Sequence, residues 1–146
     1  MKIIQAQEIK QFFNIAILVN QDESDSLHEQ FVHAVVERLR ELDFSDDYIT
    51  MVVTNAFADF PLVAASLAKS QEYSSVALIA FYAESQREEY MSMFTTATEV
   101  AIQTNTPVLM EGFCDLDDSN IDKLNHQARA LADRIYSTVS VMEQIR

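Results

Sequence analysis

The chain of 146 residues contains one glycine, Gly112, and two prolines, Pro61 and Pro107. Glycine makes up about 7% of ordinary proteins, so a chain of this length would usually carry on the order of ten. Glycine lets a backbone approach a phosphate closely, and the P-loop and the dinucleotide fingerprint each need several glycines at fixed spacing. The sequence therefore excludes nucleotide binding through a glycine-rich loop.

Acidic side chains dominate the charge of the chain. The 23 Asp and Glu residues outnumber the 10 Lys and Arg residues, giving a formal net charge of −13 at pH 7. This field repels nucleic acids and anionic membrane surfaces, so we expect neither as a partner. The single cysteine, Cys114, cannot form an internal disulfide, and no apolar run reaches the roughly 18 residues that span a bilayer. The N-terminal residues lack the pattern of a secretory leader, and we expect a cytoplasmic protein.

Continuous apolar runs predict four strands buried on both faces: Asn14–Val19, Ile49–Thr54, Val76–Tyr82 and Pro107–Met110. Apolar residues at helical spacing predict four helices, within Leu27–Leu42, Leu62–Ala68, Tyr90–Ala101 and Ile121–Val139. Phe94 is expected on the buried face of the third helix and Leu62 on that of the second.

Strands that alternate with helices imply crossover connections and a parallel sheet covered on both faces. We therefore expect a single α/β domain over residues 1–146. It is a three-layer α/β/α sandwich with a four-stranded parallel sheet in the order 2-1-3-4. The short stretch Lys2–Gln5 is a candidate for an extra N-terminal edge strand.

Helix starts are marked by residues that suit N-caps. Capping-box spacing, or its acidic variant, is found for three pairs: Ser26 with Glu29, Ser85 with Glu88, and Ser119 with Asp122. Asp59 before Phe60–Pro61 is a fourth candidate. Ligands of open α/β sheets bind beyond the carboxyl ends of the strands, so these helix starts border the expected site. That rim comprises Asn20–Asp25, Asn55–Asp59, Ala83–Arg87 and Gly112–Asp118.

Three segments carry a resemblance to a known family: ITMVVTNAFADFPLVAASLA, YSSVALIAFYAESQREEYM and NTPVLMEGF. Together they resemble the second strand, the G-A-F-E-x-P turn, the G-E-T-x-H-F-E-Y stretch and the fourth strand of lumazine synthases. The resemblance spans about Phe13 to Ser119. It implies riboflavin biosynthesis, by condensation of 5-amino-6-(ribitylamino)uracil with 3,4-dihydroxy-2-butanone 4-phosphate, with no cofactor. It also implies a homo-oligomer, with a pentamer as the expected form, in which the N-terminal strand joins a neighbour's sheet.

The resemblance also implies which residues form the site. Matched without gaps, Arg87 falls on the family's catalytic histidine and Glu84 on a neighbouring glutamate, so both are candidate catalytic residues. Asp22 falls near the ring-stacking aromatic, and Arg129 lies in the region that matches a lysine- and glycine-rich stretch. The candidate substrate-binding residues are Asp22, Ala56, Phe57, Ala58, Asp59, Ser85 and Arg129.

The residues at these positions predict altered chemistry. An arginine with a pKa of about 12 or higher does not exchange protons near neutral pH, and loss of an acid–base group typically costs about 10²–10⁴-fold in rate. Asp22 cannot stack on a ring and repels a phosphate. Two hypotheses follow: a lumazine synthase homologue with weakened or lost catalysis, or a non-catalytic member that serves as an oligomeric scaffold or binds a ribityl, flavin-like or other small molecule.

Several residues have two readings that the sequence leaves open. Arg87 either holds an anion at a helix start or pairs with Glu84 or Glu88. The acidic rim residues either bind a hard cation such as Mg²⁺ or are solvated charges, and we expect no metal. They are Asp22, Glu23, Asp25, Asp59, Asp115, Asp117 and Asp118. A phosphorelay receiver domain would need an acceptor aspartate after the third strand, where Tyr82 and Ala83 stand.

Histidine and cysteine give no recognisable catalytic pattern. His28 and His33 lie about 140° apart around a helix and cannot chelate one metal. Cys114 lacks a neighbour in the sequence that would activate it, so we expect a structural thiol.

Overall fold

A four-stranded parallel sheet in the order β2-β1-β3-β4 forms the centre of the molecule, as expected. The structure is a computed structural model that describes residues 1–22, 25–117, 119 and 121–146. The strands are β1 (Ile15–Val19), β2 (Ile49–Val53), β3 (Ser75–Tyr82) and β4 (Val108–Cys114). The helices are α1 (Ser26–Glu41), α2 (Phe60–Lys69), α3 (Arg87–Thr104) and α4 (Ile121–Ile145). Single 3-10 turns precede β2, α2 and α3: η1 (Asp46–Tyr48), η2 (Phe57–Asp59) and η3 (Glu84–Gln86).

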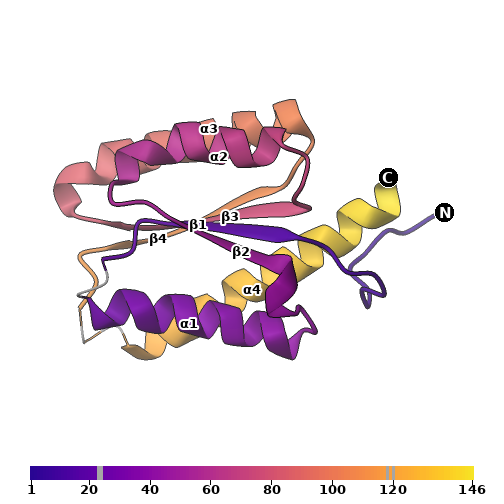
Figure 1. Ribbon diagram of the computed structural model, residues 1–146, viewed down its shortest axis with the longest axis horizontal. Helices are drawn as coiled ribbons and strands as arrows, with labels where there is room; N and C mark the ends of the chain where they lie inside the picture. Colours follow the sequence, from indigo (N-terminus) through magenta and orange to yellow (C-terminus); the bar gives the residue numbers. More distant parts are fainter. Residues whose placement is uncertain (23–24, 118, 120) are drawn as a thin grey trace.

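Helices cover both faces of the sheet, which confirms the predicted sandwich (Figure 1). Because side chains alternate along a strand, Ala16 and Leu18 of β1 pack toward α2 and α3, whereas Ile17 packs toward α1 and α4. β1 is fully buried between β2 and β3. β2 lies at the edge, and the prediction that it is buried on both faces is wrong: Val53 is 50% exposed.

Aromatic rings fill the core between the sheet and the α1–α4 layer. Phe31 of α1 is fully buried, with its ring edge-on to Phe113 at a centroid distance of 4.6 Å and edge-on to Phe81 at 6.2 Å. Such pairs contribute about 0.5–1.5 kcal/mol each beyond the area they bury. They anchor the carboxyl ends of β3 and β4 to α1, and these ends border the candidate site.

The buried faces of α2 and α3 differ from those predicted. α2 buries Phe60, Ala64 and Ala68, and Leu62 is 75% exposed. α3 buries Tyr90, Met93, Ala97 and Val100, which places Phe94 on its exposed side. Both helices are apolar over more than one stripe, so spacing alone did not select the face. Among the helices of the described residues, none has the length and apolar character needed to cross a membrane.

Left-handed backbone positions are occupied by residues other than glycine. Asp43, Gln71, Asn105 and Asp115 have φ values of 69°, 59°, 53° and 47°. Gly112 does not have a positive φ, so the chain does not need glycine there for a left-handed backbone. The ring of Tyr90 lies against the Cα of Gly112, where a Cβ would overlap the ring.

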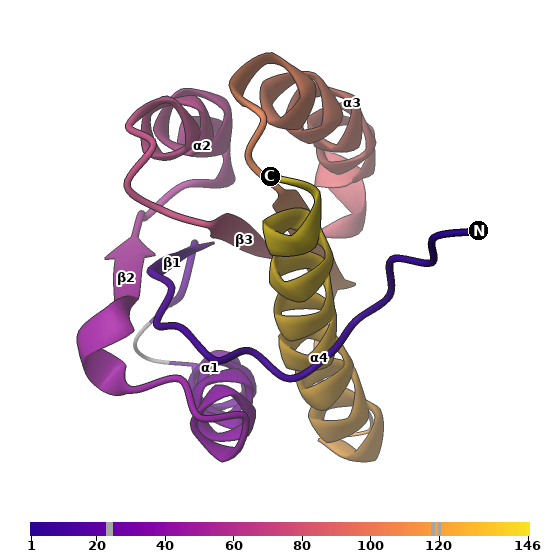
Figure 2. The same ribbon diagram turned by 90° about the vertical axis from the view of Figure 1, so that its right-hand side faces the viewer.

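The N-terminal segment does not form the predicted edge strand. Residues 1–14 contain no strand and cross α4 in an extended path (Figure 2). Side chains of α4 provide the hydrogen-bond partners that a strand would have found in a sheet. The amide of Gln144 donates to the carbonyl of Gln5 at 2.6 Å, and the Ser140 hydroxyl donates to the carbonyl of Gln7 at 2.8 Å.

Candidate functional site

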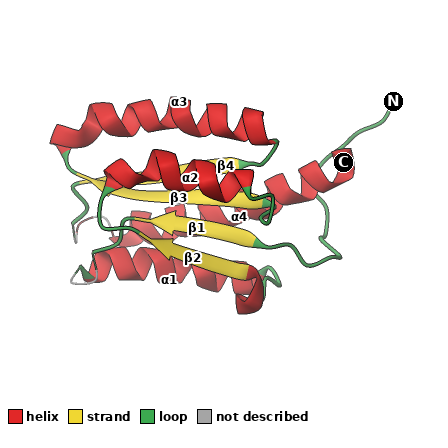
Figure 3. Cartoon of the chain, turned by 45° about the horizontal axis from the view of Figure 1, so that its top comes forward, coloured by secondary structure: helices red, strands yellow, loops and turns green. Residues whose placement is uncertain are grey.

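The carboxyl ends of β1 and β3 form a topological switch point. The chain leaves β1 toward α1 on one face and leaves β3 toward α3 on the other, so a crevice is expected between them (Figure 3). Asn20 follows β1 and continues its pairing with β3 through its side chain. Its amide group donates to the carbonyl of Phe81 at 2.8 Å, and its carbonyl accepts the Phe81 N–H at 2.8 Å. This double contact joins the residue after β1 to the end of β3.

On the α1–α4 side of the switch point lies His28. Its ring stacks on Phe81 with centroids 3.7 Å apart and an interplanar angle of 7°. Nδ1 accepts the backbone N–H of Asp22 at 3.1 Å, and Nε2 lies 3.4 Å from the carboxylate of Asp25. Burial lowers the pKa of His28, although Asp25 and Asp22 act in the opposite direction. A neutral imidazole with its proton on Nε2 fits this arrangement.

Asp25, and not Ser26, caps α1. The Asp25 carboxylate accepts the N–H groups of Leu27 at 2.9 Å and His28 at 3.4 Å, and Ser26 is the first helical residue. The predicted Ser26 cap is therefore wrong by one position, because two adjacent residues both suit a cap and spacing favoured the second.

On the α2–α3 side, Arg87 and Glu84 form a bidentate ion pair. The Arg87 Nε and Nη2 atoms each lie 2.8 Å from an oxygen of the Glu84 carboxylate. The Cys114 thiol donates to the same carboxylate at 3.3 Å. The Arg87 guanidinium, and to a smaller extent this thiol, lowers the pKa of Glu84 to about 2. Of the two readings of Arg87, the ion pair with Glu84 is the one found.

Ser85 and Asp59 do not act as the predicted helix caps. Ser85 lies inside η3, and the side chain of Gln86 accepts the N–H of Ala83 at 3.1 Å instead. Asp59 stands at the N-cap of α2, but its backbone is already helical and its side chain makes no capping hydrogen bond. Both side chains are exposed at the rim.

A hollow of about 420 Å³ lies between η2 and the first turns of α3. We call it the η2–α3 hollow. Phe57 and Ala58, two of the predicted substrate-binding residues, line it, and Phe57 is also a core residue that packs on Phe60. Ala56 precedes η2 and accepts the Thr54 hydroxyl through its carbonyl. The remaining lining residues are Pro61, Glu88, Glu89, Ser92, Met93 and Thr96.

Arg129 lies away from the other predicted site residues. Its guanidinium pairs with Glu41 at 3.4 Å, at the C-terminal end of α1. α1 begins at the site and runs about 22 Å toward the opposite edge of the sheet. The structure therefore separates Arg129 from Asp22, Glu84 and Arg87.

The acidic rim is not assembled into one group. Within the described part of the chain, Glu84, Cys114 and Asp115 offer ligand atoms within 4.8 Å of one another, but Arg87 occupies both oxygens of Glu84. The pKa of the Cys114 thiol is raised, chiefly by burial, so the thiol stays protonated. Glu23 and Asp118 lie outside the described residues. Residue 120, the position before α4, is also outside them. Ser119, the predicted cap of α4, donates a hydrogen bond from its hydroxyl to Asp117.

Comparison with known proteins adds no family assignment. No protein-family model matches the chain, and no curated protein matches it.

The site thus divides into two groups, and sequence reasoning anticipated only the Glu84–Arg87 pair, as one of two readings. Neutral His28 with Asp25 stands on one face of β3, and the Glu84–Arg87 pair with Cys114 stands on the other. Asn20 and His28 were missed as a unit because their partners, Phe81 and Asp22, depend on tertiary packing. The signal available in the sequence was the histidine three residues after an aspartate at a helix start, a spacing that places both on one turn.

Proposed function

We propose that this lumazine-synthase-like chain binds a ribityl-bearing or flavin-like small molecule in the η2–α3 hollow and has lost most of the condensation activity. The observation that carries the proposal is the bidentate pairing of Arg87 with Glu84. At the position where the family resemblance requires a proton shuttle, the chain has a permanently charged group that is already neutralised.

The position and lining of the hollow support a binding function. It lies at the carboxyl edge of the sheet, where ligands of this architecture bind. Phe57, Pro61 and Met93 offer an apolar floor, and Ser92 and Thr96 offer hydroxyls. A volume of about 420 Å³ is within the range of small-molecule sites.

The charge of the hollow favours a ligand without phosphate. Glu88 and Glu89 are the charged residues among its described lining, so a phosphate would meet repulsion there. The hydroxyls of a ribityl chain, in contrast, can donate hydrogen bonds to these carboxylates.

The condensation itself is tested first, by the absorbance of lumazine formed from the two family substrates. We expect a rate equal to the protein-free background. A rate above background that disappears in Glu84→Ala or Arg87→Ala would contradict the loss of catalysis and would support the alternative, a lumazine synthase with a changed mechanism.

Ligand binding is tested by quenching of riboflavin fluorescence and by equilibrium dialysis. We expect riboflavin to bind more tightly than its 5′-phosphate. Ser92→Phe fills the hollow and should abolish binding. Thr98→Phe, on an exposed position of α3 outside the hollow, is the matched control and should leave binding unchanged. If Ser92→Phe and Thr98→Phe bind riboflavin equally well, riboflavin does not bind in the η2–α3 hollow.

We further propose, from the resemblance, that the chain assembles with copies of itself, with a pentamer as the expected form. The exposed apolar side chains Met51 and Val53 on edge strand β2 support a self-contact.

A further inference from the structure

A second hollow, of about 470 Å³, lies at the amino edge of the sheet, away from the candidate site. We call it the aromatic hollow. Five of its lining side chains are aromatic. They come from the segment before β1, from the connection between α1 and η1, from η1 and from α4. The aromatic residues are Phe12, Phe13, Phe44, Tyr48 and Tyr136.

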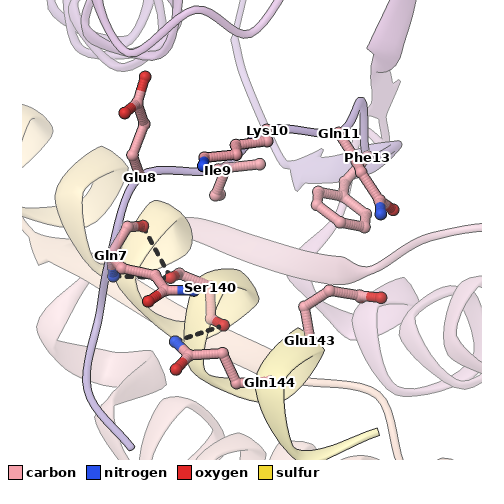
Figure 4. A pocket seen from close by; sticks show the side chains of 9 residues that line it. All are labelled: Gln7, Glu8, Ile9, Lys10, Gln11, Phe13, Ser140, Glu143 and Gln144. Carbon is pink, nitrogen blue, oxygen red and sulfur yellow. Dashed lines mark hydrogen bonds between the residues drawn. The ribbon is translucent and has the colours of Figure 1, made fainter.

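The N-terminal segment forms one wall of the aromatic hollow and is held in place by α4. The Tyr136 hydroxyl accepts the N–H of Ile9 at 2.8 Å, and the Ser140 hydroxyl accepts that of Gln7 at 2.9 Å. Figure 4 shows the adjoining pocket, in which Ile9 and Phe13 project from the same segment. The wall is therefore held by hydrogen bonds from its backbone N–H groups to side chains of α4, one of which is the lining residue Tyr136.

Four of the five rings are arranged in two pairs. Phe12 and Tyr48 stack with centroids 4.9 Å apart and planes within 4°, whereas Phe44 and Tyr136 are perpendicular at 6.2 Å. Phe12 is nevertheless 71% exposed, so most of its surface contacts solvent. The face of an aromatic ring carries partial negative charge, which attracts cations.

The charged groups around the aromatic hollow also favour a cation. Glu8 and Asp43 line it with one opposing group, Lys10. Within the described residues, none of the three is in an ion pair. The Glu8 side chain points away from α4 (Figure 4). The lining therefore has a net charge of −1 in a protein whose net charge is −13.

We propose that the aromatic hollow is a binding site for a small organic cation, of the quaternary or tertiary ammonium class. The aromatic faces attract the charge and the apolar groups around it, and Glu8 and Asp43 add a favourable field. An anionic ligand would find only Lys10. This site lies at the opposite edge of the sheet from the η2–α3 hollow, so either proposal can fail without the other.

The test uses choline as the probe and 3,3-dimethylbutan-1-ol as its uncharged carbon isostere. Both are titrated into the full chain and followed by NMR. We expect the methyl protons of choline to shift upfield, because they approach ring faces, and we expect binding at least about fivefold tighter than that of the isostere. Equal affinities would overturn the proposal. So would the lack of any chemical-shift change in the protein's own resonances at about 10 mM choline, a concentration that nearly saturates a site with a Kd of about 1 mM.

Variants locate the binding. Phe12→Leu changes an exposed side chain and leaves the core intact, and we expect choline binding about fivefold weaker. Asp43→Asn removes a charge at a left-handed position that Asn tolerates, and it should weaken choline binding but not isostere binding. Phe94→Leu, on α3 at the other face of the sheet, is the matched control. Choline binding unchanged in Phe12→Leu and in Tyr48→Leu would overturn the proposal.

Discussion

At the scale of single residues, Tyr90 accounts for the one glycine of the chain. The Tyr90 ring is packed between Tyr82, with centroids 4.1 Å apart, and Phe94, with centroids 5.1 Å apart. It is buried against the backbone of Gly112 on β4. A methyl group at residue 112 would overlap the ring, and the neighbouring rings leave it little room to move.

Gly112→Ala should therefore destabilise the protein by about 1–3 kcal/mol, although alanine is usually the better residue in a strand. Urea denaturation followed by circular dichroism measures the effect. The double variant Gly112→Ala/Tyr90→Leu removes the overlap, so its cost should be smaller than the sum of the two single costs. Additive costs would show that the ring does not cause the loss.

His28 makes stability depend on pH. Burial lowers its pKa in the folded protein below the unfolded value of about 6.5, so the unfolded chain binds more protons between the two values. Stability should fall as the pH drops from about 6.5 through the folded pKa, with no contribution above about 6.5. A folded-state pKa that is lower by one corresponds to about 1.4 kcal/mol in the free energy of unfolding.

The check compares the free energy of unfolding at pH 7.5 and pH 5 in the parent and in His28→Gln. Glutamine does not titrate and keeps an acceptor for the Asp22 N–H. The difference between the two pH values should be smaller in this variant than in the parent. His126→Gln, at an exposed histidine, should behave as the parent does. An identical pH dependence in all three proteins would contradict the role of His28.

The site was less predictable at this scale than the fold. The types of the rim residues were correct guides to position, because Glu84, Arg87 and Cys114 do meet at the carboxyl ends of β3 and β4. Their partners were not predictable. Whether Arg87 binds an anion or pairs with Glu84 depends on a 3-10 turn that places the two side chains together, and no periodicity signals that turn.

At the scale of elements, Asn105 ends α3 in the left-handed conformation, with φ 53° and ψ 36°. The position would usually hold glycine, because a Cβ there costs about 1–2 kcal/mol in most other residues. Asn105→Gly should leave stability unchanged or raise it by up to about 1 kcal/mol. Asn105→Ala should lower it by about 1 kcal/mol.

The pair of variants is matched because both keep the backbone carbonyl that accepts a hydrogen bond from Arg146. Urea midpoints at constant m-value provide the measurement. A destabilising Asn105→Gly would show that the Asn side chain, and not its backbone conformation, is what α3 requires.

Element boundaries were predicted well where apolar runs are continuous and poorly where they are not. β4 was expected to end at Met110, because Glu111 and Gly112 interrupt the apolar pattern. In the structure β4 continues to Cys114. Parallel pairing with β3 continues through both residues. Pairing is a tertiary property, so the sequence of β4 alone did not reveal its length.

At the scale of the whole molecule, the strand order 2-1-3-4 was predictable because each strand is a separate apolar run and right-handed crossovers leave few arrangements. The path of residues 1–14 was not, since it depends on the hydroxyls of Tyr136 and Ser140. Such polar contacts between distant segments leave no periodic signal.

The assembly of the chain is tested at this scale. Analytical ultracentrifugation should give a sedimentation mass near five times the chain mass of 16.6 kDa. Met51→Lys/Val53→Lys places charges on edge strand β2, and we expect it to dissociate the oligomer if that edge forms the contact. A mass near that of one chain for the parent protein would contradict the proposal.

The position of β1 in the middle of the sheet also bears on how the protein is made. Ile15 pairs with Ile49 on one side and with Ser75, 60 residues further along the chain, on the other. At about 5–20 residues per second, a ribosome needs about 3–12 s to add that length. During this time the nascent chain presents an apolar strand with at least one unpaired edge, the kind of surface that chaperones protect from aggregation. The yield of folded protein in a cell should therefore depend on chaperone supply during translation as well as on the stability of the finished fold.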